Sequence, residues 1–282
     1  MLYQIGFGGV PARPIGDGFD VHCLFPAIKS IPAETIELYF PIIIEANEAL
    51  ADSGGAGFYR GGNAQRTLYR FLCEGDVSIH DDRWMIKPWG VNGGMPGSRS
   101  RKVLWRGSME GEKVLVTSKC DYLRVYPGMF EPLLDAYRCL VLMMYTGDVL
   151  EWITWGGGGL GDPLTRPAAL VALEVHRRLV TLSGAAKNYG VVVNPSDFNV
   201  DEEATTALRA KMTEERGPLD TNGYNRGGTI TELMAKCEEE TGLKSPKPQW
   251  DKRPYGPHTG LEYVKEWYAK MGKEGMGGWD NA

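Results

Sequence analysis

Glycine is the residue that most constrains what this chain can fold into. It occurs 37 times in 282 residues and comes in compact clusters rather than in a low-complexity linker. That is about twice the average usage. Runs this rich in glycine do not form regular helices or strands, because glycine loses more conformational freedom on folding than any other residue. The clusters at 52–62, 87–97 and 155–163 therefore predict tight turns or places where two backbones approach closely.

The composition excludes several classes of protein. A net charge of −5 favours no polyanion, so nucleic acid is not an expected partner. The N-terminus lacks the basic and long apolar regions of a signal peptide, and the longest apolar run, Cys139–Tyr145, is too short to cross a membrane. The five cysteines are scattered and include no CxxC pair, which argues against disulfides and structural zinc. We expect a cytoplasmic protein with buried, reduced thiols and no membrane partner.

Residues 1–160 are predicted to be rich in β-strands. In GFDVHCLF the alternation predicts a strand with Asp20 and His22 on one face. Further strands are predicted at 35–44 and 63–72 from β-branched and aromatic residues. Two hairpins are predicted, KVLWR with EKVLVTS around GSMEG, and CLVLMMY with VLEWITW around TGD.

Helices are predicted after Asp162 from the spacing of apolar residues and from capping signals. They are Pro167–Leu179, with a stripe of Leu170, Leu173 and Val180, then Leu182–Gly190, Asp201–Glu215, Thr229–Thr241 and Leu261–Met271. The expected fold class is α+β, with a β-rich region and helices packed at its C-terminal end. We divide the chain into the β-rich glycine-loop region 1–160, a helical part of the same domain at 161–217, and an extension or docking tail at 218–282.

The first two glycine clusters each allow a functional and a structural interpretation. The cluster at 52–62 fits an anion-binding nest, with Arg60 reaching out of it, or a structural loop between two strands. The cluster at 155–163 precedes a helix as phosphate loops do, but it has no GK[ST] and no surrounding βαβ unit. Close packing of its backbone against a neighbouring subunit is the favoured interpretation.

The third cluster is followed by four basic residues. Trp89 would anchor the glycine-rich loop 87–97. The basic residues are Arg99, Arg101, Lys102 and Arg106. They can attract an anionic ligand, although four charges on a solvated hairpin are the commoner case.

The four histidines show no metal-binding spacing such as HExxH or HxH. His22 is the most informative of them, because Asp20 lies two residues before it. An acid–histidine pair on one strand face can transfer protons. The alternative is a hydrogen-bonded structural histidine.

Six blocks of sequence occur in one order. They are GGVPARPIGDGFDVH, SIPAETIELYFP, DSGGAGFYRGG, PWGVNGGMPG, GDVLEWITWGGGGLGDP and NYGVVV. Over residues 3–216 this order resembles the C-terminal half of the hydantoinase B family. That family includes the B subunit of N-methylhydantoinase, the matching part of 5-oxoprolinase, and the large subunits of acetone and acetophenone carboxylases.

The resemblance implies a mechanism shared between subunits. A partner of the hydantoinase A type would bind ATP with Mg²⁺ and phosphorylate the substrate. The B subunit would then complete either hydrolysis of a cyclic amide or carboxylation of a ketone. In this family His22 falls in a block that typically reads Asp-Gly-x-x-x-His, which implies a place at the active site with Asp20. The loops expected to face substrate or a partner contain Asp52, Gly54, Gly55, Arg60, Gly61, Gly62, Gly156, Gly157, Gly158, Gly159 and Asp162.

The chain also departs from the family pattern. Lys29-Ser30 stands where Asn-Thr is usual, and Thr154-Trp155 where Thr-Pro is usual, which leaves the substrate class open. The N-terminal half of the family, with its His/Asp metal-ligand motifs, has no counterpart here. We therefore expect no metal or cofactor in this chain, and a separate chain that supplies the N-terminal half of the B subunit with a divalent metal.

Two further interpretations come from other classes of protein. A non-catalytic scaffold subunit would hold the catalytic subunits together. A β-sandwich that binds carbohydrate would bind its ligand as an isolated chain, but the absence of a signal peptide counts against it.

Overall fold

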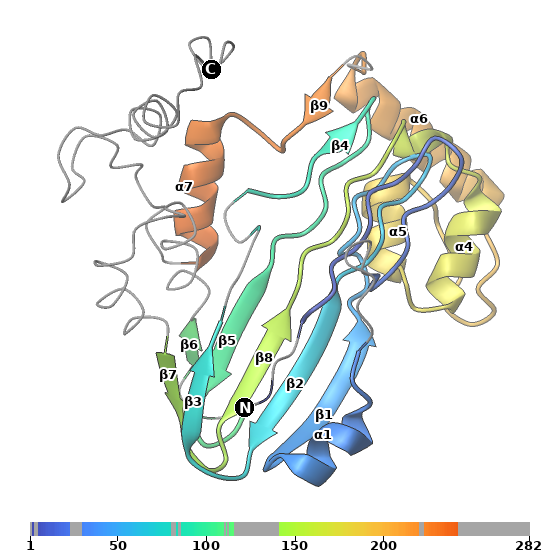
Figure 1. Ribbon diagram of the computed structural model, residues 1–282. Helices are drawn as coiled ribbons and strands as arrows, with labels where there is room; N and C mark the ends of the chain where they lie inside the picture. Colours follow the sequence, from blue (N-terminus) through green and yellow to red (C-terminus); the bar gives the residue numbers. More distant parts are fainter. Residues whose placement is uncertain are drawn as a thin grey trace, which may run out of the picture. The chain divides into compact units, whose positions relative to one another are not determined.

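A computed structural model describes most of the first 241 residues. The described residues are 2, 5–22, 30–79, 83, 86–109, 111, 113–115, 141–219 and 223–241. The chain divides into one compact unit, Met1–Lys244, and a second, Ser245–Ala282, whose residues all lie outside the described ones. The helix predicted at Leu261–Met271 therefore lies outside them as well. Figure 1 shows the arrangement of the elements.

The centre of the compact unit is a five-stranded antiparallel sheet. Its order is β1 (Ile42–Ala49), β2 (Gln65–Phe71), β8 (Val149–Ile153), β5 (Arg101–Trp105) and β6 (Lys113–Leu115). The strand predicted at 63–72 is confirmed as β2, and the first predicted hairpin is confirmed as the β5–β6 pair. The loop at 52–62 connects β1 to β2, as its structural interpretation required.

One face of the sheet carries an apolar core. The register places Tyr69 opposite Leu150, and Leu150 opposite Leu104, so these side chains lie side by side on one face. The buried members of the cluster are Tyr69, Phe71, Ile79, Leu104, Met144 and Leu150. Alternation with period two is the ordinary way in which a strand buries one face, and here it could be predicted from the sequence.

The second predicted hairpin is wrong in its pairing. Both strands exist, but β7 (Val141–Met144) pairs with β3 (Gly75–Ser78), whereas β8 lies between β2 and β5. The turn between them is organised by the buried carboxylate of Asp148, which accepts hydrogen bonds from the backbone of Tyr145 and Gly107 and from Arg106. The two strands that this turn joins belong to different sheets.

The strand predicted at 35–44 is partly wrong. Its first half is helix α1 (Ala33–Tyr39), and β1 begins only at Ile42. The segment AETIELY contains good helix formers and has Glu34 in its first turn, which favours a helix locally. Pro41 separates the helix from the strand, because the residue before a proline is driven out of the helical region.

A helical layer follows the sheet. It contains a short 3₁₀ turn η1 (Pro163–Thr165), then α4 (Ala168–His176), α5 (Leu182–Tyr189) and α6 (Glu202–Arg216). The predicted end of α5 at Gly190 is confirmed by a left-handed φ of 62° there. The predicted stripe on α4 is displaced, since Leu170 and Leu173 are exposed while Val171 and Val175 are buried.

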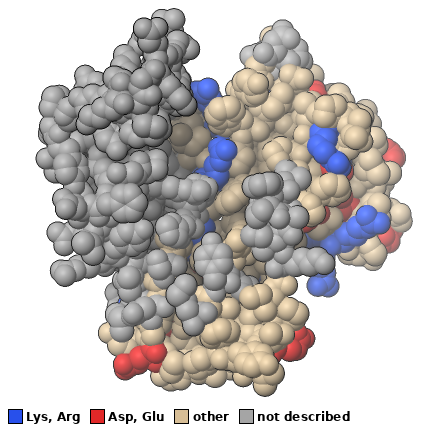
Figure 2. Space-filling view, viewed as in Figure 1, with Lys and Arg blue, Asp and Glu red and all other residues tan. Residues whose placement is uncertain are grey.

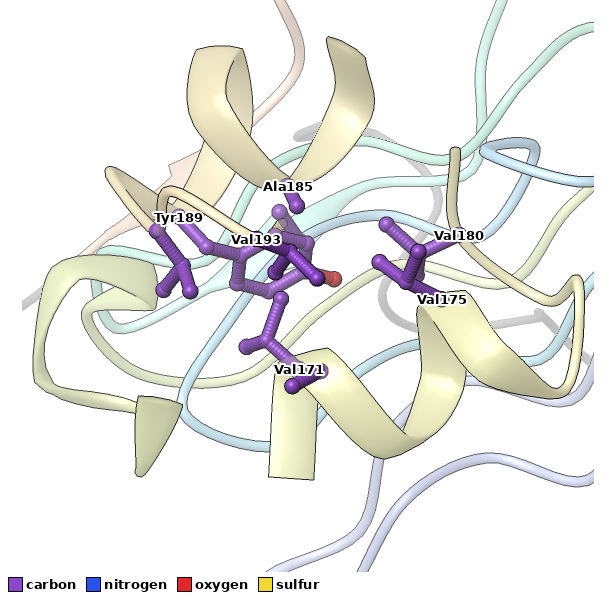
Figure 3. Packing of buried hydrophobic residues seen from close by; sticks show 9 residues of the cluster. Val171, Val175, Val180, Ala185, Tyr189 and Val193 are labelled. Carbon is purple, nitrogen blue, oxygen red and sulfur yellow. The ribbon is translucent and has the colours of Figure 1, made fainter. Parts of the chain in front are cut away.

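The helices pack through a second apolar cluster. Figure 3 shows the Tyr189 ring lying among valines from α4 and from the segments on either side of α5. Its buried members are Ala56, Val171, Ala172, Val175, Val180, Ala185, Tyr189, Val191 and Val193. Ala56 comes from the first glycine cluster, so this layer packs directly against the glycine loops.

The predicted extension packs back onto the third glycine cluster. Strand β9 (Tyr224–Asn225) pairs with β4 (Gly90–Val91), and α7 (Ile230–Thr241) confirms the helix predicted there. The domain boundaries at 160 and 217 stay a prediction, since the compact unit continues to Lys244. None of the described helices is long and apolar enough to cross a membrane.

Among the five cysteines, the structure describes the side chain of one. Cys73 is free and exposed, whereas buried thiols were expected. The side chains of the other four lie outside the described parts of the chain.

The glycine clusters come together in a structure of their own, which we call the glycine bundle. It consists of segments 5–18, 52–62, 88–98 and 155–161, which run from the sheet toward the helices in Figure 1. Backbone hydrogen bonds join them, and their partners recur at steps of three residues. Gly9 and Ala12 donate to Trp155 and Gly158, each at 2.8 Å, and Gly156 and Gly159 donate to Ser98 and Met95.

The segment 155–161 lies at the centre of the glycine bundle. A Cβ at Gly156 or Gly159 would overlap segment 52–62, one at Gly157 would overlap segment 5–18, and one at Gly158 would overlap Trp89. Successive residues of this segment thus face three different neighbours, and the direction repeats after three residues. This is the period of a polyproline II helix, which has no internal hydrogen bonds. None of these four glycines has positive φ, so close approach is what requires them. The backbone that they touch belongs to this chain. Packing of this loop against a neighbouring subunit stays a prediction.

Candidate functional site

The candidate site is organised by Arg60, at the end of the first glycine cluster. The sequence suggested that this side chain reaches outward, but it is only 3% exposed. Its Nη1 donates to Asp20 at 2.8 Å and its Nε donates to Glu174 of α4 at 2.8 Å. Arg60 therefore ties the N-terminal segment to the helical layer through the glycine bundle.

Arg166 completes a network of buried charges. It lies just before α4, and its Nη2 donates to Asp17 at 2.7 Å and to Glu174 at 3.0 Å. Glu174 thus bridges the guanidinium groups of Arg60 and Arg166. Burying charges is tolerated only when they are paired and hydrogen-bonded. We call Asp17, Asp20, Arg60, Arg166 and Glu174 the arginine network.

The pKa shifts of Asp17, Arg60 and Arg166 favour the charged form of each group. Burial alone would raise the pKa of Asp17, but the hydrogen bond and charge of Arg166 hold that pKa below its usual value. Burial would lower the pKa of Arg60, and its bonds to Asp20 and Glu174 raise it instead. Tyr189 beside the network is buried without a hydrogen-bond partner for its hydroxyl, and burial followed by the charge of Glu174 raises its pKa.

The segment with the predicted acid–histidine pair is a turn, and the predicted strand is wrong for its described residues 19–22. Val21 has a φ of 46°, which is a strained conformation for a β-branched residue. The turn is held at both ends, because Val21 N donates to Asn63 and His22 N donates to Gly8. A side-chain pattern with period two could not reveal it, since the hydrogen bonds that bend the chain come from distant segments.

Asp20 and His22 lie on the same turn but are not joined to each other. The Asp20 carboxylate accepts from Asn63 N at 2.6 Å and from both Nη atoms of Arg60. The exposed His22 ring lies against Phe19, with centroids 5.2 Å apart. The Arg13 guanidinium lies 4.2 Å from the centroid of the same Phe19 ring. Asp20 thus holds the turn, while the imidazole stays accessible.

The other predicted loop residues build the scaffold. Asp52 accepts from the backbone and hydroxyl of Thr181 at the start of α5. Asp162 caps the η1 turn and pairs with Arg216 at 2.7 Å. The glycines at these positions pack within the bundle, and they are Gly54, Gly55, Gly61, Gly62, Gly156, Gly157, Gly158 and Gly159. Among the described residues no group of three His, Cys, Asp or Glu side chains could hold a metal ion.

Sequence reasoning missed three members of the arginine network, namely Asp17, Glu174 and Arg166. One signal was present for Glu174, which is a lone acid in the apolar run AALVALEV of α4. A buried acid in such a position requires a buried cation. Its partner Arg60 is 114 residues away, so the pairing itself could not be predicted.

Comparison with known proteins supports the family resemblance seen in the sequence. The family described as hydantoinase B/oxoprolinase matches residues 1–163, more than half of the chain. The chain belongs to the hydantoinase B/oxoprolinase family. The matched residues include the whole glycine bundle, the turn at His22 and Arg60.

Several relatives extend the comparison. The beta subunit of caprolactamase from Pseudomonas jessenii is 31% identical over 67% of this chain. The crystal structure of ATP-dependent caprolactamase from the same organism superimposes with a TM-score of 0.56, at 27% identity over 72% of this chain and 32% of that chain. A nucleotide-free acetone carboxylase shares the fold with a TM-score of 0.55 at 20% identity, covering 95% of this chain and 37% of that chain. The chain spans 29% of the caprolactamase subunit.

Proposed function

We propose that this chain is part of an ATP-dependent enzyme of the hydantoinase and carboxylase type, and that the turn at His22 lines its reaction site. Relatives of the chain are subunits of such enzymes. The observation that carries the proposal is the strained turn at Val21, held by the arginine network inside the matched region. Strain of this kind persists only where the surrounding structure fixes it, and it clusters at functional sites.

The chemistry assigned to His22 is proton transfer. An imidazole can both accept and donate a proton, and this one is exposed. Asp20 acts as a positioning residue, because its carboxylate is bonded to Arg60 and to the backbone of Asn63. In amide hydrolysis such a histidine would take a proton from water and return one to the leaving nitrogen.

Cyclic amides are the substrates that we propose first. The caprolactamase is both a sequence relative and a structural neighbour above 25% identity. Carboxylation of a ketone is the alternative, favoured by the family relationship to the alpha subunit of acetone carboxylase, 27% identical over 65% of this chain. We assign ATP with Mg²⁺, and the divalent metal, to partner chains: an A-type subunit that phosphorylates the substrate and a chain that supplies the N-terminal half of the B subunit.

The test uses the complex purified with its native partners. ATP-dependent turnover of a cyclic amide, and of a ketone with bicarbonate, is measured for wild type and for His22→Ala. Loss of a proton-transfer group should reduce turnover by ~100-fold or more. The matched control is His176→Ala, since this histidine is also exposed but lies on α4 against Phe198.

The outcomes separate an active-site residue from a scaffold. An active-site role requires that the complex stays assembled while His22→Ala alone loses turnover. If His22→Ala retains full activity, the chain acts as a scaffold and the proposed role of His22 is wrong. Mass spectrometry of the purified complex identifies the partners, and a chain found alone would contradict the assignment to a multi-subunit enzyme.

A further inference from the structure

Lys87 is a half-buried cation whose described neighbours include further cations. Burial lowers the pKa of its ammonium group, and the charges of Arg99 and Lys236 lower it further. No carboxylate among the described residues pairs with Lys87. A partly desolvated charge normally has a counter-ion, so the position calls for an anion.

Backbone contacts join the segments that carry these cations. The Pro88 carbonyl accepts from Gly97 N at 3.0 Å, which brings the two ends of the loop 88–97 together. On the other side, Gly227 packs against Pro96, and Lys236 Nζ donates to the Gly227 carbonyl at 3.4 Å. These contacts connect the third glycine cluster, the segment at Gly227 and Lys236 of α7.

Two exposed aromatic rings lie beside Arg226. Trp89 is 39% exposed, and the guanidinium of Arg226 lies 4.7 Å from its ring centroid. Tyr224, which is 67% exposed, meets Trp89 edge-on with centroids 5.5 Å apart. Figure 2 shows basic side chains near the middle of one face, and further basic and acidic side chains together on its right side.

The sequence suggested a different set of basic residues after the third cluster. Arg101 and Arg106 are in ion pairs with Glu151 and Asp148, and Lys102 is buried over Trp152. Only Arg99 of the four is among the charges that act on Lys87, and it has further contacts of its own.

We propose that Lys87, Lys236 and Arg226, beside the ring of Trp89, form a binding site for the phosphate group of a small molecule. A phosphate monoester carries a charge of about −1.5 to −2 at neutral pH, so it balances several cations where a carboxylate balances one. Lysine binds phosphate as a point charge, and arginine adds a planar donor group. Hydrogen bonds from Thr229 lower the pKa of Glu232, and the charge of Lys236 lowers it further. This site goes beyond the proposed function and does not depend on the role of His22.

Equilibrium dialysis of the full chain tests the site, with inorganic phosphate and adenosine monophosphate as probes at constant ionic strength. We expect saturable binding of phosphate in wild type, and at least tenfold weaker binding in Lys87→Gln and in Lys236→Gln. The matched control is Lys211→Gln on α6, which removes the same charge from an exposed side chain paired with Glu215. It should bind phosphate as wild type does.

Lys87→Gln removes repulsion between like charges, so its melting temperature should match or exceed that of wild type, and unfolding cannot explain a loss of binding. Tighter binding of the nucleotide that is lost in Trp89→Leu would support a nucleotide as the ligand. Equal binding of both probes would support recognition of the phosphate group alone. The proposal is overturned if phosphate does not bind saturably, or if Lys211→Gln weakens binding as much as Lys87→Gln does.

Discussion

The sheet and the glycine bundle hold together by opposite means. In the sheet, side chains such as Leu104 and Leu150 fill the space between elements, and the backbone serves as a frame. In the glycine bundle, backbones touch directly, and the place of a side chain at Gly158 is taken by a carbonyl oxygen of Trp89. The first kind of packing tolerates exchange of similar residues, because side chains can shift, whereas the second has nothing that can move aside.

The largest expected effect is that of a single methyl group in the bundle. Gly158→Ala should destabilise the fold by about 5 kcal/mol or more, which is an exceptional value for one substitution. Gly75→Ala in β3 is the control, since nothing lies within 4 Å of a Cβ there and the effect should stay below about 1 kcal/mol. Soluble yield and urea unfolding measure both. Equal stability of the two variants would show that the backbones of the bundle can move apart to admit a methyl group. That result would contradict the proposed difference from the sheet.

A second test compares ion pairs in the two regions. Arg60→Met leaves Glu174 paired with Arg166 alone and removes the ion pair of Asp20, and truncating a buried pair should destabilise by about 3–5 kcal/mol. On the sheet, Arg70→Gln breaks the pair with Glu45, in which both side chains are 29% exposed, and should change stability by about 0–1 kcal/mol. Urea unfolding of both variants gives the difference. If the two variants lost equal amounts of unfolding free energy, the arginine network would contribute no more to stability than a surface ion pair.

The smallest expected effect depends on pH. The folded pKa of Asp17 lies below its unfolded value, so its contribution is present above the unfolded pKa and is lost as the pH falls through the folded pKa. Asp17→Asn should therefore be less stable than wild type at neutral pH, by about 1 kcal/mol. The difference should narrow as the pH falls below about 4. Unfolding curves at several pH values measure it, and a difference that is constant with pH would exclude the charge of Asp17 as the cause.

The same contrast explains what could be predicted from the sequence. The strand at Tyr69 and the helix ending at Gly190 were predicted, because period and capping act within a few residues. The glycine clusters were recognised, but not their assembly. Hydrogen bonds between Gly9 and Trp155, for example, leave no side-chain pattern to detect.

The candidate site was predicted in part for the same reason. The sequence predicts His22 and Asp20 as neighbours on a strand, while the structure separates their roles on a turn. Val21 gave no signal for its positive φ, because β-branched residues ordinarily favour extended conformations. Lys87 was not singled out, since its meaning depends on Lys236, which lies 149 residues later (236 − 87) on α7.

The order in which the glycine bundle can form has a consequence for the nascent chain. Its central segment ends at residue 161, and that segment bonds to others that begin as early as Gly9. Such high contact order predicts slow folding, since the entropy of closing long loops is lost before the non-local contacts can stabilise the fold. On the ribosome the first three segments would leave the exit tunnel before their hydrogen-bond partners in the fourth segment, and assembly would wait for it. This part of the chain is thus where we expect the greatest need for chaperones during synthesis.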